Sequence, residues 1–294
     1  MPQDHLHLLR FRAPAAAEET LAEFAAAAEL DLATVRTPES AELLAQLFAE
    51  SAAAADQLAA RLRAELPRWL PDFDPASLER DTLRREDWAE SWKRFFHVQR
   101  ITPRLVVKPS WEAYTPAPGE LVLELDPGMS FGTGYHGTTR ACLEFLDRLS
   151  QELPEAALLD VGCGSGILAL AAWKLGFRPV RAVDNDPDAV RIARENLERN
   201  GASGVAVEVA DLADYLPPQP ARVVVANILA PVLIRFAPRL ASFLDSRHGP
   251  AYLALAGILH GQYPEVRATF TALGFTECAT RAIDEWSSGL FRWR

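Results

Sequence analysis

The C-terminal two thirds of the sequence alternates short apolar runs with longer segments in which apolar residues recur at helical spacing. The runs predict strands and the longer segments predict helices. Strands are expected at residues 157–161, 180–184, 205–209, 222–226 and 251–256, and helices at 140–149, 166–176, 187–200, 231–241 and 262–273. This alternation is typical of an α/β fold with a mostly parallel sheet that helices cover on both faces.

Further apolar runs flank this alternating region. The runs at residues 105–108 and 121–125 also predict strands, and the C-terminal segment 276–294 predicts a hairpin that turns at Ser287-Ser288-Gly289.

The first 85 residues follow a different pattern and are rich in alanine. The predicted order is a strand, a helix, a strand, an ambiguous segment at residues 41–49, a helix at 52–66 and a last strand. If the ambiguous segment is a strand rather than a helix, the order is βαββαβ. This order predicts a smaller α+β domain of the ferredoxin-like kind.

Residues 86–104 carry Trp88, Trp92, Phe95 and Phe96 at helical spacing. Such an aromatic stripe is typical of packing, and it predicts a connecting helix between two domains. The expected organisation is therefore an N-terminal domain of residues 1–85, a connecting helix at 86–104 and a C-terminal domain of residues 105–294.

Composition narrows the class of protein. Hydrophobic residues make up 49% of the 294 positions, as in an ordinary globular chain, and the formal net charge is -10. This charge argues against a protein that grips nucleic acid through a basic face, although it allows a basic protein partner. The three cysteines form no CxxC pair, so we expect neither a metal site nor a disulfide framework.

The apolar runs also bear on location. No apolar run reaches about 18 residues, and the N-terminus lacks a secretory h-region. We therefore expect a cytoplasmic protein without membrane contact, and a monomer.

The strongest chemical motif is Asp160-Val161-Gly162-Cys163-Gly164-Ser165-Gly166, which joins a predicted strand to a predicted helix. Glycines allow a sharp turn and close approach of a ligand. The G-x-G-x-G spacing differs from the G-x-G-x-x-G of dinucleotide binders and favours a ligand without a pyrophosphate, such as S-adenosylmethionine. A plain strand-to-helix turn is the alternative.

Asp184 ends the next strand, 22 positions after Gly162, where a carboxylate can accept hydrogen bonds from ribose hydroxyls. Asp186 followed by Pro187 predicts a helix N-cap. A second ribose contact through Asp186 is the alternative.

Two further polar residues follow predicted strands. Asp211 can meet an adenine amino group or can be a solvated turn acid. Asn227 can accept hydrogen bonds from a substrate amine, assisted by the next backbone carbonyl, or it can cap the helix near Pro231. Both pairs of interpretations remain open on the sequence.

The segment 126–139 holds four glycines and three threonines in 14 residues. Such a loop can fold over a ligand with hydroxyls and backbone N–H groups facing it. His136 within it is a candidate general base, although a lone histidine is more often structural.

Several segments together resemble a known family. They are D-W-A-E-S-W-K from Asp87, K-P-S-W-E from Lys108, P-G-M-S-F-G-T-G-Y-H-G-T-T from Pro127, the glycine turn, V-D-N-D-P-D-A-V from Val183, V-V-A-N-I-L-A from Val224, A-G-I-L from Ala256, and E-W at residues 285–286. The chain resembles the PrmA family of methyltransferases that modify large-subunit ribosomal protein eleven.

The resemblance implies a class I methyltransferase, with a Rossmann-like seven-stranded sheet whose last strand is reversed. It also implies S-adenosylmethionine contacts at Thr139, Gly162, Asp184 and Asn227. The implied neighbours of the cofactor are Phe131, Thr133 and Gly164. The implied substrate is a basic ribosomal protein, methylated on lysine side chains and on the terminal α-amine. The resemblance also implies that the N-terminal domain recognises this substrate. Residues 1–85 match only in element order, and Asn185 stands where an apolar residue is usual.

The expected reaction is in-line attack of a neutral amine on the sulfonium methyl group, with orientation and desolvation as the main contributions. Rival interpretations are a methyltransferase for a small molecule or nucleic-acid base, a binding scaffold that retains the fold, and a nicotinamide dehydrogenase.

Overall fold

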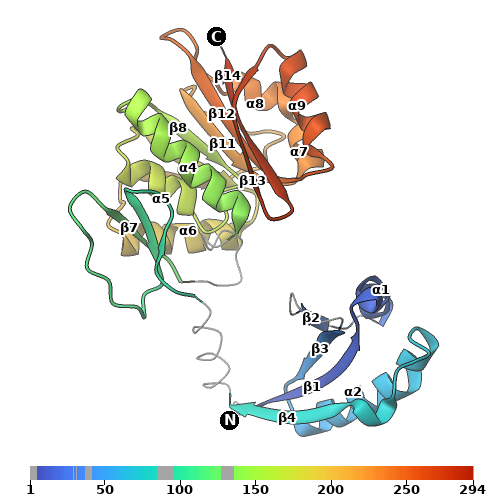
Figure 1. The fold of residues 1–294 in the computed structure, drawn as a ribbon. Helices are drawn as coiled ribbons and strands as arrows, with labels where there is room; N and C mark the ends of the chain where they lie inside the picture. The colour runs from blue at the N-terminus through green and yellow to red at the C-terminus, as the bar shows by residue number, and fades with distance from the viewer. Residues whose placement is uncertain are drawn as a thin grey trace. The chain divides into compact units, whose positions relative to one another are not determined.

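The computed structural model describes residues 5–28, 30, 32–36, 42–84, 96–126 and 136–293. The chain divides into two compact units, Met1–Phe95 and Phe96–Arg294, called the N-terminal unit and the C-terminal unit below (Figure 1). Within the described residues, no helix is long and apolar enough to cross a membrane.

The N-terminal unit is a four-stranded antiparallel sheet with two helices. Its strand order, β2-β3-β1-β4, and its βαββαβ element order are those of a ferredoxin-like domain, which confirms that prediction. The elements are β1 (His5–Pro14), α1 (Glu18–Ala28), β2 (Leu32–Arg36), β3 (Glu42–Ala49), α2 (Ala52–Glu65) and β4 (Glu79–Arg84), with 3-10 turns at Ala15–Ala17, Leu66–Arg68 and Pro75–Ser77.

The ambiguous segment of this unit is strand β3, because every second residue from Leu43 to Ala49 is buried. The core lies between the sheet and the helices, where Leu9 and Phe11 of β1 meet Leu21 of α1 and Leu62 of α2. Helix α2 begins where Ser51 Oγ accepts a hydrogen bond from Ala54 N at 3.1 Å.

The C-terminal unit is built on a seven-stranded sheet in the order β10-β9-β8-β11-β12-β14-β13. The pairs from β10 to β12 are parallel, and β14 is antiparallel to both of its neighbours. This is the predicted α/β fold with a reversed last strand. The strands are β8 (Leu158–Val161), β9 (Val180–Asp184), β10 (Val205–Val209), β11 (Val223–Asn227), β12 (Ala251–Leu259), β13 (Thr276–Ile283) and β14 (Trp286–Trp293).

Helices cover both faces of this sheet (Figure 1), and each face has its own apolar cluster. One face carries α4 (Gly137–Glu152), α5 (Ile167–Lys174) and α6 (Pro187–Arg199), and the other carries α7 (Ala230–Arg235), α8 (Ala237–Ser242) and α9 (Tyr263–Ala272). The central strand β8 is buried at every position, which explains its continuous apolar sequence. The single helix expected at 231–241 is wrong, because Phe236 leaves the helical conformation between α7 and α8.

A small second sheet of three strands, β5-β6-β7, belongs to the same unit. Its strands are β5 (Gln99–Arg100), β6 (Leu105–Lys108) and β7 (Leu121–Glu124). The connecting helix predicted for 86–104 is therefore wrong over residues 96–104, where the chain enters β5 instead. The aromatic spacing therefore did not indicate a helix over residues 96–104, and the rest of the predicted helix, residues 86–95, lies outside the described residues.

The C-terminal hairpin turns earlier than expected. Its turn is at Asp284-Glu285, where Asp284 has a φ of 52°, and Ser287, Ser288 and Gly289 lie inside β14. The small polar residues that suggested a turn are buried against β12, because β14 is an interior strand of the sheet. The correction places Trp286 at the start of β14 rather than before a turn.

Candidate active site

A cavity of about 670 Å³ opens at the carboxyl ends of the parallel strands of the C-terminal unit. Its walls come from the glycine turn after β8, from the segments that follow β9, β10 and β11, and from Gly257 of β12. Thr139 of α4, Trp286 of β14 and residues of α5 and α7 also line it. Open α/β sheets bind their ligands at this edge, so the cavity is the candidate active site.

The glycine turn forms part of the cavity wall. Gly162 has a φ of 71°, and its N–H and that of Cys163 donate to Val183 O at 2.9 and 3.0 Å. A Cβ on Gly162 would lie 2.3 Å from Cγ2 of Ile228, so a larger residue is excluded by contact as well as by conformation. Gly162 and Gly164 both line the cavity, where the sequence placed them.

Asp184 lies at the cavity wall with its carboxylate held in a set orientation. Its Oδ2 accepts a hydrogen bond from Gly164 N at 2.8 Å, and its Oδ1 accepts one from Asp186 N at 3.0 Å. Each carboxylate oxygen can accept more than one hydrogen bond, so both remain able to bind a ribose hydroxyl. Asp186 is the N-cap of α6, accepting from Asp188 N at 2.9 Å, as predicted.

Asp160 is a buried acid beneath the glycine turn. Its pKa is raised from 3.8 to about 7, mainly by burial, with a hydrogen bond from Ala169 N acting to lower it and the charge of Asp184 acting to raise it. Oδ2 accepts that bond at 3.1 Å, whereas Oδ1 has no partner in the described part of the chain. The sequence marked Asp160 only as part of the motif.

Asn227 lies at the end of β11, beside Thr139. Its Nδ2 lies 3.4 Å from Thr139 Oγ1, to which it donates, and its Oδ1 is buried with no partner among the described residues. Helix α7 has Leu229 at its N-cap position and no side-chain cap bond, so the helix-cap interpretation of Asn227 is wrong. The amide instead lines the cavity with an unused acceptor.

Asp211 lies on the far side of the cavity, after β10. Its Oδ1 accepts from Ala213 N at 2.7 Å, so the residue is an exposed turn acid that also lines the cavity. The structure therefore shows the turn acid, and the contact with adenine stays a prediction.

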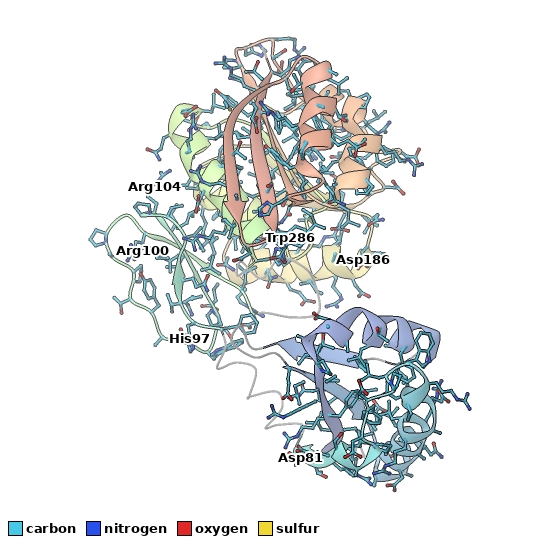
Figure 2. All side chains as sticks on the ribbon, turned by 45° about the vertical axis from the view of Figure 1, so that its right-hand side comes forward. Asp81, His97, Arg100, Arg104, Asp186 and Trp286 are labelled. Atoms are coloured by element: carbon cyan, nitrogen blue, oxygen red, sulfur yellow. The ribbon has the colours of Figure 1, made fainter. Side chains whose placement is uncertain are left out.

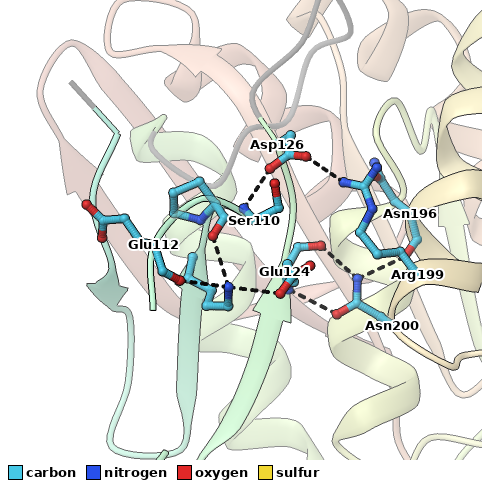
Figure 3. Close-up of polar contacts among 9 residues, drawn as sticks. Ser110, Glu112, Glu124, Asp126, Asn196, Arg199 and Asn200 are labelled. Atoms are coloured by element: carbon cyan, nitrogen blue, oxygen red, sulfur yellow. Dashed lines mark hydrogen bonds and ion pairs between the residues drawn. The ribbon is translucent and has the colours of Figure 1, made fainter. Parts of the chain in front are cut away.

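Of the glycine-rich segment 126–139, only residue 126 and residues 136–139 are among the described residues. Phe131 and Thr133 lie outside the described residues. On the N-terminal side, Asp126 accepts from Ser110 N at 2.7 Å and pairs with Arg199 of α6 at 2.8 Å (Figure 3). Beside it, Asn200 exchanges hydrogen bonds with the backbone of Glu124, which ties β7 to α6.

On the C-terminal side of that segment, His136 contacts groups of the protein rather than standing alone. Its Nδ1 lies 2.9 Å from Thr138 Oγ1, and its ring centroid lies 4.9 Å from that of Trp286. Trp286 and Asp186 lie at the same end of the C-terminal unit (Figure 2). The contacts of His136 with Thr138 and Trp286 favour a structural role for this histidine.

Trp286 and Gly257 line the cavity without having been expected there, and Ile228, expected only through its backbone carbonyl, also lines it. The only signal was their place in the short motifs E-W, A-G-I-L and N-I-L-A.

The strand order with its reversed β14, the glycine turn after β8 and the acid after β9 define a class I S-adenosylmethionine-dependent methyltransferase. The residues present fit that cofactor. Gly162 and Gly164 present their backbone at the cavity wall, Asp184 offers two oriented oxygens for ribose, and the unused Oδ1 of Asn227 faces the same cavity.

Comparison with known proteins identifies the family. The family described as "Ribosomal protein L11 methyltransferase (PrmA)" matches residues 12–292, and the chain belongs to it. The protein of that name from Geobacter metallireducens is 46% identical over 222 residues, which are 75% of this chain and 71% of the relative. That from Chloroflexus aurantiacus is 42% identical over 229 residues, covering 70% and 68% of the two chains.

A solved structure agrees with this placement. The crystal structure of a ribosomal protein L11 methylase from Lactobacillus delbrueckii subsp. bulgaricus aligns with a TM-score of 0.60 at 31% identity, covering 67% of this chain and 98% of that one. The chain is thus a protein methyltransferase, and S-adenosylmethionine is its methyl donor.

Proposed function

We propose that this protein transfers methyl groups from S-adenosylmethionine to amino groups of ribosomal protein L11, on lysine side chains, on the N-terminal α-amine or on both. The observation that carries the proposal is the buried Oδ1 of Asn227, which has no donor in the described part of the chain and lines the cofactor cavity. A buried acceptor is costly unless a donor meets it, and a substrate amine supplies N–H donors.

The geometry around Asn227 suits an amine. Donation from Nδ2 to Thr139 Oγ1 turns Oδ1 away from α4. The backbone carbonyl of Ile228 follows directly and receives no hydrogen bond from the described residues. Two acceptors side by side would take two N–H groups and point the nitrogen lone pair in one direction. Bound S-adenosylmethionine supplies a methyl group on a positively charged sulfur.

The amine must lose a proton before it can attack, because the ordinary pKa of lysine is about 10.4. Ile228, Leu229 and Trp286 are apolar walls on this side of the cavity and would favour the neutral amine by desolvation. Of the carboxylates of the cavity, Asp184 ends β9 and Asp211 follows β10, and β8 separates these strands from β11 in the sheet. We infer that the proton leaves to water and that Asn227 orients rather than deprotonates.

We also infer that residues 1–85 recognise the protein substrate. They form a folded unit with its own core, and every described lining residue of the cavity belongs to the C-terminal unit. One amine offers too little surface to distinguish one protein from another, so specificity requires a second contact area. A ribosomal-protein substrate is consistent with a cytoplasmic enzyme that binds no nucleic acid directly.

The proposal is tested by incubating the protein with isotopically labelled S-adenosylmethionine and purified L11, with an unrelated basic ribosomal protein as the control. We expect label on amino groups of L11 alone, located by peptide mass spectrometry. Label on oxygen or sulfur atoms, or equal labelling of the control protein, would contradict it.

A further inference from the structure

Strand β12 contains a β-bulge at the wall of the cavity. Its pairing with β14 joins Leu255 to Gly289 and then Ile258 to Ser287, so that Ala256 and Gly257 together face one residue of β14. Gly257 has a φ of 83°, in the left-handed region that favours glycine. Bulges bend a strand locally and often lie next to active sites, where they re-aim neighbouring groups.

The bulge is in direct contact with the backbone of Ile228. Ile228 N donates to Ala256 O at 3.1 Å. A Cβ on Gly257 would lie 2.4 Å from the Ile228 carbonyl oxygen and 2.9 Å from the carbonyl carbon. These are backbone atoms, which cannot rotate away as the end of a side chain can. Any side chain at position 257 would therefore displace the Ile228 peptide.

Ile228 is held from the other side by the cofactor turn. Its Cγ2 lies 2.3 Å from the place of a Cβ on Gly162, so no side chain fits there either. Ile228 is thus wedged between two positive-φ glycines, with its side chain against the turn after β8 and its backbone against the bulge of β12. These two contacts hold Ile228 in place, and with it the end of β11, where Asn227 lies.

We propose that Gly257 is a positioning residue for methyl transfer, because its missing side chain lets the Ile228 carbonyl sit at the cavity wall as the second acceptor for the substrate amine. This inference rests on the proposed function. Ile228 and Gly257 both line the cavity, and the carbonyl receives no hydrogen bond from the described residues. In-line transfer is sensitive to geometry, and a displacement of about 1 Å can cost about 100-fold in rate.

The test is Gly257→Ala in the full chain, with purified L11 as substrate. We expect kcat to fall about 100-fold, because the acceptor is displaced. Affinity for S-adenosylmethionine should stay within about threefold of the unchanged protein, since Asp184 and the glycine turn keep their own contacts. A purely structural role would lower the melting temperature without this split between kcat and cofactor binding.

Gly274→Ala is the matched control. Gly274 has a φ of 95°, so alanine there suffers the same kind of backbone strain, but a Cβ would meet nothing within 4 Å. We expect Gly274→Ala to lose stability and to keep kcat. An equal loss of kcat in both variants would show that strain alone is responsible and would overturn the inference.

A second variant covers the case in which Gly257→Ala folds poorly. Gly257→Ala combined with Ile228→Gly removes the contact with Gly162 and gives the displaced peptide room to move. The double variant should bind S-adenosylmethionine and still turn over about 100-fold more slowly. A kcat within about threefold of the unchanged protein in either variant would overturn the inference.

Asn227→Ala, measured in parallel, separates this inference from the proposed function. If Asn227→Ala abolishes turnover and Gly257→Ala leaves it unchanged, the positioning role is wrong and the amine site stands. If neither substitution changes turnover, the amine site itself is wrong, and the role of Gly257 is wrong with it.

Discussion

The N-terminal unit buries an apolar core, whereas the C-terminal unit buries polar groups as well. All eight buried polar side chains of the described chain belong to the C-terminal unit, among them Asp160, Thr138 and Thr139. Charged groups of the N-terminal unit stay at its surface, as in the ion pair between Arg10 and Glu79 at 2.7 Å. The two units are both built from helices and strands, but within the described residues only the C-terminal unit buries polar side chains.

The difference marks where the chemistry lies. Burying a polar group costs free energy unless it is hydrogen-bonded, so such groups persist where they are used or fully paired. Asn196 is paired through its amide nitrogen, which donates to Ser165 O at 2.9 Å and ties α6 to the glycine turn. Asp160 and Asn227 keep one unpaired oxygen each near the cavity. An unpaired acceptor beside a cavity indicates a ligand, and the N-terminal unit shows no such group among its described residues.

Removing residues 1–85, which hold the described strands and helices of the N-terminal unit, should have the largest effect. We expect a fragment of residues 86–294 to bind S-adenosylmethionine normally and to lose methylation of L11 by at least about 100-fold, because the second contact area is gone. Methylation of a small amine, such as Nα-acetyl-lysine amide, whose side-chain amine is free, should persist weakly in both proteins. Calorimetric titration and a mass-spectrometric assay measure the two properties. Full methylation of L11 by the fragment would show that this unit is not the recognition module.

Asn227→Ala tests whether the unpaired acceptor acts on the amine. We expect kcat to fall about 100-fold, because the amine loses one of its two acceptors. Stability should change little, since the side chain makes a single long hydrogen bond. Asn200→Ala is the control. Asn200 lies away from the cavity and bonds the backbone of Glu124, so this substitution should lower stability without lowering turnover. Normal turnover by Asn227→Ala would remove Asn227 from the chemistry.

Asp184→Ala tests the cofactor side of the same cavity. Loss of hydrogen bonds to a charged acceptor, worth about 1.5–3 kcal/mol, should weaken S-adenosylmethionine binding about 10- to 100-fold. Asp186→Ala is the matched control, because it removes only an N-cap worth about 0.5–2 kcal/mol of stability. Isothermal titration calorimetry measures the affinity of both variants for S-adenosylmethionine. Equal affinities would contradict the assignment of Asp184 to the cofactor site.

Asp160 gives the smallest expected effect, a dependence of stability on pH. Because burial raises its pKa from 3.8 to about 7, the folded protein holds a proton that the unfolded chain has lost between these values. The free energy of unfolding should therefore fall as pH rises through this window, by up to about 1.4 kcal/mol per pH unit. Urea unfolding at pH 4.5 and 6.5 should show a weaker dependence in Asp160→Asn. The same slope in both proteins would place the effect elsewhere.

Much of the fold followed from local patterns. The strand-to-helix alternation of the C-terminal unit, the glycine turn and the N-cap at Asp186 all depend on neighbours within one turn of chain, which the sequence displays directly. The errors were also local in origin. Small polar residues at Ser287-Ser288-Gly289 look like a turn until β14 is known to be an interior strand, and aromatic spacing predicted helix where the chain enters β5.

The site divides in the same way. Local sequence is enough to place a glycine turn and an acid 22 positions later at one edge of the sheet, because one strand-turn-helix unit and the next strand carry them. Their contact with a nucleoside stays a prediction. Only the tertiary structure decided that Asn227 keeps a free acceptor rather than capping α7, and that Gly257 presses against Ile228. These contacts join residues from different strands, so they depend on strand order and on the register shift at one bulge. No local pattern of hydrophobic and polar positions carries that information.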